Sequence, residues 1–502
     1  MKLRLVGHEY KYAVEQIMLS LFPGEKPEYL SDADASIDSA DLSAESRLTF
    51  SETTALSASA IRYRGKVFRG AARVSRKKLA NKLVADRLLQ RIVKQSFFRA
   101  AKGLLGVPPV WGSLTGIRPA HIASSAMEAG RSAGSAKRML TGEYYVSPER
   151  AEMCIQAAQA SLALKQELLP SDIALYIGIP FCPTRCAYCS FVSNSVEKSF
   201  GMIAPFVELL LREIEMAAAM VRGAGLRITS IYVGGGTPTA LPEPELSAVM
   251  SALQASFDLA GVREFTFEAG RPDTITEGKL DIITRYGVRR ICVNPQSMSD
   301  DVLNAIGRKH SASDVLNAVR MVRQSGAALN MDAIAGLPAD TPMGFQNTID
   351  SILALNPENV TIHTLSLKKG AKIMLEGTEV PAGEDVGAML DYAFRQLSSG
   401  GWRPYYLYRQ KFTTGGFENT GWCLPGHEGV YNICMMEELC TVLALGGGGV
   451  TKLVSPEGRI ERIFNAKYPR EYLLYADKLS EKYDKIKKFV SGEPSPTHKQ
   501  EE

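Results

Sequence analysis

The chain has 502 residues, of which 45% are hydrophobic and 22% charged, and its formal net charge is +4. This length predicts two or three domains with a large buried core. The composition is that of a globular protein without an apolar run long enough to cross a bilayer, and so small a charge does not indicate a nucleic-acid partner. The first residues, MKLRLVGHEYKYAVEQ, interrupt their apolar positions with charges and lack a cleavage site, so we expect a cytoplasmic protein that does not engage a membrane.

Residues 1–165 are expected to hold a small α/β or α+β domain and a connector. Strand-like alternation occurs at Leu48–Phe50 and Ile61–Val67, after a loop-like segment at Ser31–Glu45. Apolar residues then recur at helical spacing over Ser75–Leu105. The connector begins at the turn-rich segment WGSLTGIRPAHI, which an Ala-rich helical stretch follows.

Positive charge is concentrated between Arg62 and Lys102, where 14 Lys or Arg residues accompany one acidic residue, Asp86. A solvated, Lys/Arg-rich helix surface accounts for such a run. A surface that binds an anion, either RNA or a polycarboxylate, is the alternative. We expect the solvated surface.

Residues 166–368 alternate short β-branched runs with helical segments. Six strands are expected, at Ala174–Ile179, Ile228–Val233, Glu264–Glu268, Arg289–Val293, Ala328–Ile334 and Asn359–Leu365. Helices are expected between them at Phe206–Val221, Pro244–Phe257, Thr276–Tyr286, Ser313–Gln324 and Pro342–Leu355. Six successive units of this kind predict a parallel sheet that curls into a full or partial TIM-like (β/α)6 barrel. The chemistry of such a barrel belongs in the loops after the carboxyl ends of the strands.

Beyond this barrel the regularity fades. We expect residues 369–479 to form a mixed C-terminal extension that covers the substrate, with a Gly-rich segment at Gly446–Gly449. Residues 480–502 are expected to form a helix followed by a disordered tail, because Lys/Glu repeats give way to SGEPSPTHKQEE.

The first barrel strand runs directly into IPFCPTRCAYCSF, which brings Cys182, Cys186 and Cys189 within eight residues. Three thiolates at this spacing can each bind a different iron of one [4Fe-4S] cluster, which leaves the fourth iron open for S-adenosylmethionine (SAM). A structural zinc site is the alternative, but it would lack a ligand because no His or fourth Cys is nearby. The segment therefore predicts a radical SAM enzyme, in which the reduced cluster cleaves a carbon–sulfur bond of SAM.

Glycines and polar residues also recur where the other strands end. The second strand ends in YVGGGTPT, whose glycines allow the backbone to approach a ligand closely. The third strand ends at Glu268, the fourth leads to Gln296 and then Arg308, the fifth contains Asp332, and the sixth ends near Ser366. Glu268 suits the hydroxyl or amine groups of SAM, and Arg308 suits a carboxylate. Taken singly these are ordinary loop residues, but together they predict an active site at the barrel mouth.

These motifs, in this order, resemble the oxygen-independent coproporphyrinogen III oxidase (coproporphyrinogen dehydrogenase) family of radical SAM proteins. The likeness covers about Asp172 to Leu453 through IPFCPTRCAYCSF, GGGTPT, FEAGRPD, PQSMSDDVLNAIGRKHS, MDAIAGLP and GGGGVTKL. The long N-terminal extension with WGSLTGIRP is similar to the HemZ-type branch. The resemblance implies a [4Fe-4S] cluster, one SAM bound to it and, as in the decarboxylase, a second SAM beside the first.

The resemblance implies roles for single residues as well. The cluster would be held by Cys182, Cys186 and Cys189. The first SAM would contact Tyr176, Gly235, Glu268 and Leu453. The second SAM would contact Tyr188, Gly236, Thr237, Gln296, Arg308, Asp332 and Ser366. No protein side chain is singled out as catalytic, because the radical arises at the cluster-bound SAM.

The implied reaction is the oxidative decarboxylation of coproporphyrinogen III in anaerobic haem synthesis. A 5′-deoxyadenosyl radical removes a hydrogen atom from the β-carbon of a propionate, and loss of carbon dioxide and one electron leaves a vinyl group. Two such events give protoporphyrinogen IX. The implied partners are the porphyrinogen, a low-potential electron donor of the flavodoxin or ferredoxin type and an electron acceptor, and we expect a monomer.

The residues that follow the third cysteine leave alternative functions open. Ser190 and Phe191 follow the third cysteine, where decarboxylases have Gly-Cys, and this pair is closer to the haem-chaperone branch. A haem-binding or haem-transfer protein is therefore the main alternative, with a haem-degrading radical SAM methyltransferase and an RNA-modifying radical enzyme as further ones. Cys292 is expected in the strand core, and His363 either in the core or in the pocket.

Overall fold

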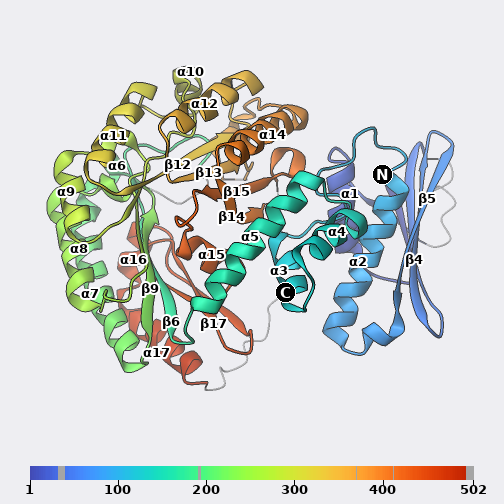
Figure 1. The fold of residues 1–502 in the computed structure, drawn as a ribbon, viewed down its shortest axis with the longest axis horizontal. Helices are drawn as coiled ribbons and strands as arrows, with labels where there is room; N and C mark the ends of the chain where they lie inside the picture. Colours follow the sequence, from blue (N-terminus) through green and yellow to red (C-terminus); the bar gives the residue numbers. More distant parts are fainter. Residues whose placement is uncertain (32–39, 190–193, 369, 411, 493–502) are drawn as a thin grey trace. The chain divides into compact units, whose positions relative to one another are not determined.

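In the computed structural model the chain divides into two compact units, Met1–Ile155 and Gln156–Glu502 (Figure 1). The structure describes residues 1–31, 40–189, 194–368, 370–410 and 412–492. Ser190, Phe191 and the last part of the tail expected to be disordered lie outside these residues. Within the described ranges, no helix combines the length and the apolar character needed to cross a membrane.

The first unit is built on a mixed sheet with the strand order β2-β1-β3-β4-β5. Its strands are β1 (Lys2–Val6), β2 (Glu28–Leu30), β3 (Leu42–Phe50), β4 (Thr54–Tyr63) and β5 (Lys66–Ser75). Its helices are α1 (Lys11–Leu21), α2 (Lys82–Ala101), α3 (Ala120–Glu128) and α4 (Ala133–Glu143), and α5 (Pro148–Glu167) begins in it. Buried side chains of α1 and α2 pack on Leu3, Ala44 and Ile61 of the sheet. This arrangement confirms the predicted α/β or α+β N-terminal fold.

The strands of this unit begin and end at other positions than the sequence suggested. Strand β3 begins at Leu42, inside the segment expected to be a loop, and Ile61–Val67 is not one strand but holds the end of β4, a turn at residues 64–65 and the start of β5. The buried face of β4 is partly polar, since the hydroxyls of Ser57 and Ser59 each lie 2.8 Å from that of Ser96 on α2. A search for apolar alternation misses strands that bury serine in this way.

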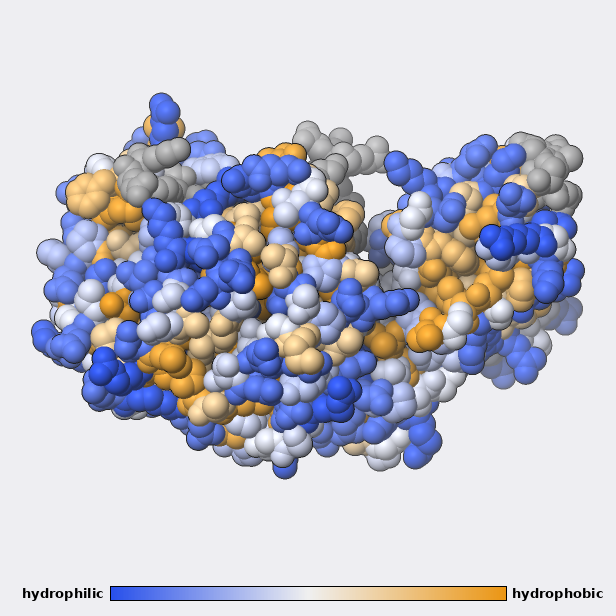
Figure 2. All heavy atoms as spheres, turned by 90° about the horizontal axis from the view of Figure 1, so that it is seen from above, coloured by the Kyte–Doolittle hydropathy of each residue, from blue (hydrophilic) through white to orange (hydrophobic). Residues whose placement is uncertain are grey.

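The basic residues of the first unit lie largely on its surface. Along β5, Arg69 and Arg73 are exposed, whereas Ala72 and Val74 between and beyond them are buried. Figure 2 shows hydrophilic and hydrophobic residues interspersed on the face in view. Alternation along one strand therefore accounts for part of the dense run of positive charge.

The second unit is built on a large sheet with the strand order β14-β15-β13-β12-β11-β10-β9-β6-β16-β17-β18. Its centre consists of the six expected strands, β6 (Asp172–Ile179), β9 (Arg227–Gly235), β10 (Glu264–Glu268), β11 (Arg290–Cys292), β12 (Ala328–Ala335) and β13 (Asn359–Thr364). Neighbours among these six are all parallel. The predicted partial barrel is confirmed.

Helices follow the central strands and cover the outside of the curved sheet (Figure 1). The long ones are α7 (Ile203–Gly223), α8 (Glu243–Ser256), α9 (Glu277–Arg285), α11 (Ala312–Gln324) and α12 (Pro342–Ala354). Side-chain caps define several starts: the Thr276 hydroxyl accepts from Lys279 N, and Ser311 and Asp314 form a reciprocal capping box. Short elements are β7 (Phe181–Cys182), β8 (Asn194–Ser195), α6 (Val196–Ser199) and α10 (Asp300–Ala305).

The C-terminal region extends the same sheet at both edges. On one edge β15 (Glu418–Cys423) pairs antiparallel with β13, and β14 (Arg403–Arg409) pairs with β15. On the other edge β16 (Thr441–Gly446) runs parallel to β6, followed by β17 (Val450–Val454) and β18 (Ile460–Phe464). The helices are α13 (Lys372–Glu376), α14 (Gly383–Ser399), α15 (Val430–Glu437), α16 (Pro469–Leu474) and α17 (Leu479–Val490).

A buried ion pair holds the last helices against the barrel. Glu213 of α7 and Lys482 of α17 are 0% and 1% exposed, and Lys482 Nζ lies 2.7 Å from Glu213 Oε1. The other Glu213 oxygen accepts from Gly446 N at 2.8 Å and from the Tyr472 hydroxyl. Lys482 Nζ also donates to the carbonyl of Ala444 at 2.6 Å. This pair therefore fixes the end of β16 and the start of the Gly-rich turn that follows it.

Candidate active site

A cavity of about 560 Å3 opens where the central strands end and continues into the interior of the barrel. Gly235, Glu268 and Ser366 line its outer part, whereas Thr266 and Asn330 lie further back along their strands. The interior of this barrel is therefore polar and hollow instead of being filled by apolar layers. The predicted site residues that line the cavity are Tyr176, Cys182, Cys186, Tyr188, Cys189, Gly235, Gly236, Thr237, Glu268, Gln296, Arg308, Asp332 and Ser366.

Leu453 is the predicted site residue that does not line the cavity. Its side chain is completely buried in β17, and Val450 of the same strand contributes to the cavity wall instead. Glycines 448 and 449, which precede this strand, also line the cavity. The Gly-rich turn thus reaches the site, but the leucine side chain points into the core.

The three cysteines come from one irregular segment after β6. Cys182 ends β7, and its Sγ lies 3.7 Å from the hydroxyl of Thr237. Ala187 N donates to Ile306 O at 2.9 Å, which ties the segment to the loop after α10. None of the eight cysteines, all within the described part of the chain, is in a disulfide. In the described ranges no three His, Cys, Asp or Glu side chains gather as ligands of a single metal ion.

The turn after β9 approaches the cysteine segment closely, as its glycines predict. A Cβ on Gly236 would lie 2.9 Å from Cys182 Sγ and 2.4 Å from the carbonyl oxygen of Phe181. Gly235 has φ +117°, a conformation that residues with a side chain rarely adopt. Thr237 N donates to Phe181 O at 2.7 Å and holds the two segments together. Any larger residue at position 236 would push the first cysteine away from its place.

Glu268 is half-buried at the end of β10 and is held by two donors. The Tyr232 hydroxyl donates to one of its oxygens, and Asn294 Nδ2 donates to the other at 2.9 Å. Burial, with a smaller effect from the nearby Asp332 carboxylate, raises the pKa of Glu268 to about 7. Tyr176 stacks on Tyr232 with 6.4 Å between ring centroids. Glu268 can therefore hold or release a proton near neutral pH.

Asp332 and His363 face each other across neighbouring strands, with 3.6 Å between Asp332 Oδ2 and His363 Nε2. Burial acts to lower the pKa of His363, but contacts with Asp332 and Asn419 outweigh it, so the pKa is raised. His363 lines the cavity, so it is a pocket residue and not a core one. Cys292 is buried in β11 as expected, and burial raises the pKa of its thiol well above the usual value.

Gln296 and Arg308 lie together beneath the mouth. Gln296 has φ +69°, in the left-handed region that a side chain disfavours, and such strain is often found at functional sites. Arg308 is buried and donates to the carbonyl oxygens of Pro295 and Gly270, each at 3.2 Å, and of Asn294. Three polar atoms here are buried and have no partner among the described residues: Asn294 Oδ1, Gln296 Oε1 and Arg308 Nε. Buried polar atoms without a partner are costly, so this part of the cavity is built to receive a ligand.

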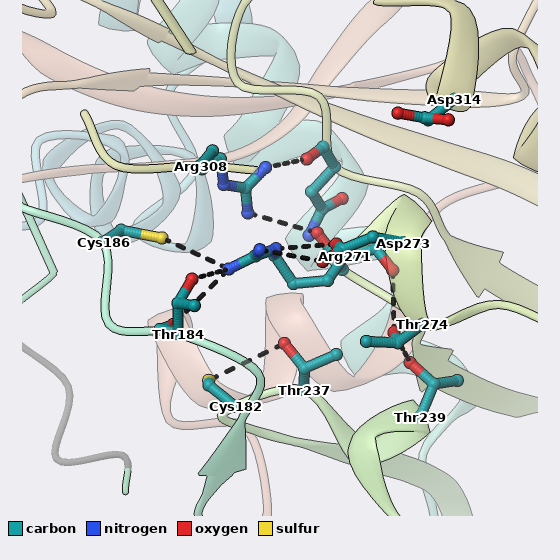
Figure 3. A network of polar contacts seen from close by, with 12 residues as sticks. Cys182, Thr184, Cys186, Thr237, Thr239, Arg271, Asp273, Thr274, Arg308 and Asp314 are labelled. Atoms are coloured by element: carbon teal, nitrogen blue, oxygen red, sulfur yellow. Dashed lines mark hydrogen bonds and ion pairs between the residues drawn. The ribbon is translucent and has the colours of Figure 1, made fainter. Parts of the chain in front are cut away.

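Arg271 is a cavity residue that the sequence analysis did not identify. Figure 3 shows its guanidinium between Asp273 and the segment that contains Thr184 and Cys186. Its position in FEAGRPD, three residues after Glu268, was the available signal. Without the folded loop, however, that arginine resembles any charged residue in a turn.

A second set of unforeseen residues comes from the C-terminal region. Strand β14 and helix α15 contribute aromatic and thioether side chains to the cavity: Tyr405, Tyr406, Tyr408, Tyr431, Met435 and Met436. The rings of Tyr232 and Tyr431 stack with centroids 4.6 Å apart, which joins the barrel to the extension. The repeated tyrosines of PYYLYRQ were a signal, but the sequence does not show that this strand joins the barrel sheet.

The donors and the space suit a [4Fe-4S] cluster with SAM. Three soft thiols lie in one cavity wall, next to a glycine turn whose backbone lies close against the cysteine segment. The unpartnered amide oxygens of Asn294 and Gln296 can accept hydrogen bonds from the amine, ribose or adenine of a nucleoside ligand. The residues present therefore fit the cofactors that the cysteine spacing predicts.

Comparison with known proteins agrees with this arrangement. A family model described as the Radical SAM superfamily matches residues 176–352. The chain is 36% identical over 374 residues to the oxygen-independent coproporphyrinogen-III oxidase-like protein HemZ of Bacillus subtilis (strain 168), with 73% of this chain and 75% of that protein covered. It is 25% identical over 304 residues to the heme chaperone HemW of Escherichia coli (strain K12), with 60% and 75% covered.

Among solved structures, the chain is similar to coproporphyrinogen III oxidase (HemN) from Escherichia coli, which is described as a radical SAM enzyme. The TM-score is 0.51 at 19% sequence identity, with 66% of this chain and 78% of that chain covered. At this identity the likeness concerns the fold, and it agrees with the partial barrel.

Proposed function

The chain belongs to the oxygen-independent coproporphyrinogen III oxidase family of radical SAM proteins, in its HemZ-type branch, and we propose that it decarboxylates coproporphyrinogen III oxidatively to protoporphyrinogen IX. One observation carries the proposal. A single cavity joins the three thiols and the predicted SAM residues to a chamber lined by tyrosine and methionine. Such a chamber suits the apolar ring of a tetrapyrrole, next to the place where the radical would be generated.

Membership of the radical SAM superfamily implies a [4Fe-4S] cluster and SAM. In our proposal Cys182, Cys186 and Cys189 hold the cluster. Tyr176, Gly235 and Glu268, with the backbone near Leu453, would hold the first SAM. When bound, the two cofactors supply a one-electron cleavage of SAM. A second SAM would use Tyr188, Gly236, Thr237, Gln296, Arg308, Asp332 and Ser366, all of which line the same cavity.

The other side chains of the site would bind and orient the ligands and exclude water. Glu268, with a pKa of about 7, would be held as a carboxylate by the positive charge of a bound SAM. The partnerless oxygens of Asn294 and Gln296 would orient the nucleoside. The enclosing wall from β14 and α15 would keep water from the reacting carbon, which protects a radical from side reactions.

The cations of the cavity support a substrate whose carboxylates stay near the rim. Arg290 donates to Glu264 at 2.6 Å and to the His427 carbonyl at 2.8 Å, so its charge is already used within the protein. Arg308 donates to carbonyl oxygens, and in our proposal its unpartnered Nε meets the second SAM and not the porphyrinogen. Lys368 also lines the cavity and is exposed, so it can meet a propionate at the entrance. The uncharged macrocycle would then lie against the tyrosines.

We also propose that different segments of the chain have different roles. Residues 166–368 would generate the radical, and residues 369–479 would cover the substrate, since β14 and α15 contribute much of the distal cavity wall. The expected electron partners are a donor of the flavodoxin or ferredoxin type and an electron acceptor. Among the described residues, none before Tyr176 lines the cavity.

A haem-binding or haem-transfer protein is the second candidate, because the chain is also similar to the heme chaperone HemW. Such a protein would keep the cluster and the SAM site but would leave a porphyrinogen unchanged. Stoichiometric haem binding without protoporphyrin formation is its expected behaviour. A haem-degrading methyltransferase would instead transfer a methyl group to its substrate, so that the product would carry this group.

The test is an anaerobic turnover experiment with the full-length, cluster-reconstituted protein. It is mixed with SAM, a low-potential reductant, an electron acceptor and coproporphyrinogen III, and 5′-deoxyadenosine and protoporphyrin are quantified after oxidation. We expect about two 5′-deoxyadenosine molecules for each protoporphyrin, because each of two propionates loses one hydrogen atom. Deoxyadenosine without any change in the porphyrin would refute the decarboxylase and favour the second candidate.

A further inference from the structure

Arg271 connects the third strand's loop to the cysteine segment through one buried guanidinium. It follows β10 by three residues, and its side chain is 2% exposed. On one side Nε and Nη2 each lie 3.0 Å from an oxygen of Asp273, which makes a bidentate ion pair. The other side of the guanidinium faces the cysteine segment (Figure 3).

That other side makes three contacts with two residues. Nη1 donates to the Thr184 hydroxyl at 3.1 Å and to the Thr184 carbonyl oxygen at 3.4 Å. The same Nη1 lies 3.9 Å from the Sγ of Cys186, within the reach of a hydrogen bond to sulfur. An arginine is always charged at physiological pH, so this N–H is a permanent donor. The contact is to a sulfur and not only to the backbone that supports it.

Hydrogen bonds to the sulfur ligands help to set the reduction potential of an iron–sulfur cluster. A donor aimed at a thiolate withdraws electron density from it, which favours the cluster with the extra electron. Outer residues that hold ligands in place also tune the metal site. The charge of Arg271 is balanced by Asp273, which is 27% exposed, so the local field depends on both members of the pair.

We propose that Arg271 is a positioning residue that holds the cysteine segment and, with Asp273, sets the reduction potential of the cluster bound there. The inference rests on the proposed function only in so far as Cys186 is a cluster ligand. It requires neither a porphyrinogen nor a second SAM. Arg271 raises the potential through its N–H and charge, and Asp273 limits the rise.

The two members of the pair should therefore act in opposite directions. Arg271→Met leaves the Asp273 carboxylate beside the cluster, so the midpoint potential falls. Asp273→Asn leaves the guanidinium without its counter-ion, so the midpoint potential rises. We expect each to change the ratio of reduced to oxidised cluster at fixed potential by about tenfold, or about 59 mV for one electron. A residue that only supports the fold would not give shifts of opposite sign.

The experiment is a redox titration of the reconstituted full-length protein, followed by electron paramagnetic resonance without SAM or substrate. Thr184→Val is the matched control, because it removes a hydroxyl contact of Arg271 but leaves the contact with Cys186 Sγ. We expect its midpoint to equal that of the unchanged protein. Iron and sulfide content is measured on each sample, so that only cluster-loaded protein is compared.

If cluster-loaded Arg271→Met and Asp273→Asn both have the midpoint potential of the unchanged protein, the inference is overturned. If Arg271→Met does not assemble a cluster, Asp273→Asn decides alone, because it keeps the shape of the side chain: a rise supports the inference and an unchanged midpoint overturns it. Failure of the proposed function and failure of this inference can be told apart. Shifted midpoints in a protein that makes no protoporphyrin would leave this inference standing, whereas full cluster assembly by Cys186→Ala would remove its basis.

Discussion

The buried pair of Glu213 and Lys482 offers a quantitative test of how the C-terminal helices stabilise the barrel. Both side chains are essentially without solvent, at 0% and 1% exposure, so water does not screen the carboxylate when its partner is removed. Lys482→Met removes the ammonium but keeps most of the side-chain volume. Breaking a buried pair by removing one partner costs about 3–5 kcal/mol. The Gly446 N–H and the Tyr472 hydroxyl still donate to Glu213, so we expect the lower end, about 3 kcal/mol.

The assay is urea unfolding of the metal-free protein followed by tryptophan fluorescence. Trp402 and Trp422 are both buried in the second unit and report its transition. The double variant Glu213→Leu/Lys482→Met is the matched control, because replacing both charges by apolar groups is often neutral. We expect it to recover most of the lost free energy of unfolding. A loss below about 1 kcal/mol in Lys482→Met, the value of an exposed pair, would refute the reasoning.

Three further predictions concern the site. Cys186→Ala should abolish the cluster absorbance and the cleavage of SAM together, and normal turnover in this variant would contradict the cluster assignment. Gly236→Ala should lower the iron content severalfold, because its Cβ would lie 2.9 Å from Cys182 Sγ, whereas Gly201→Ala, with open space around it, should load normally. Glu268 holds its proton up to about pH 7, against a usual pKa of 4.5, so the free energy of unfolding of the metal-free protein should fall as pH rises through this interval. Glu268→Gln should reduce that slope in urea titrations at pH 5, 6 and 7, although Asp340, whose pKa burial raises to about 6, also contributes to it, and an unchanged slope would contradict the shifted pKa of Glu268.

The central strands and the cysteine segment were predictable because their signals are local. All six barrel strands lie within two residues of their expected bounds, since buried parallel strands read as β-branched runs between helical patterns. The same periodicity implies that strand ends meet at one edge, which is why Glu268, Gln296 and Asp332 could be expected in one cavity. The spacing of the three cysteines needs no tertiary information at all.

Other features depended on contacts between residues far apart in the chain. The sequence alone determined the fold class and the thiols, because these follow from spacing within short windows, and the order of its motifs indicated the family by resemblance. Only the tertiary structure decided that β16 pairs with β6, that tyrosines of β14 and α15 enclose the cavity, and that Leu453 points away from it. It also decided that Arg271 reaches Cys186, because a contact across 85 positions arises from the packing of two loops and leaves no periodic trace in the sequence.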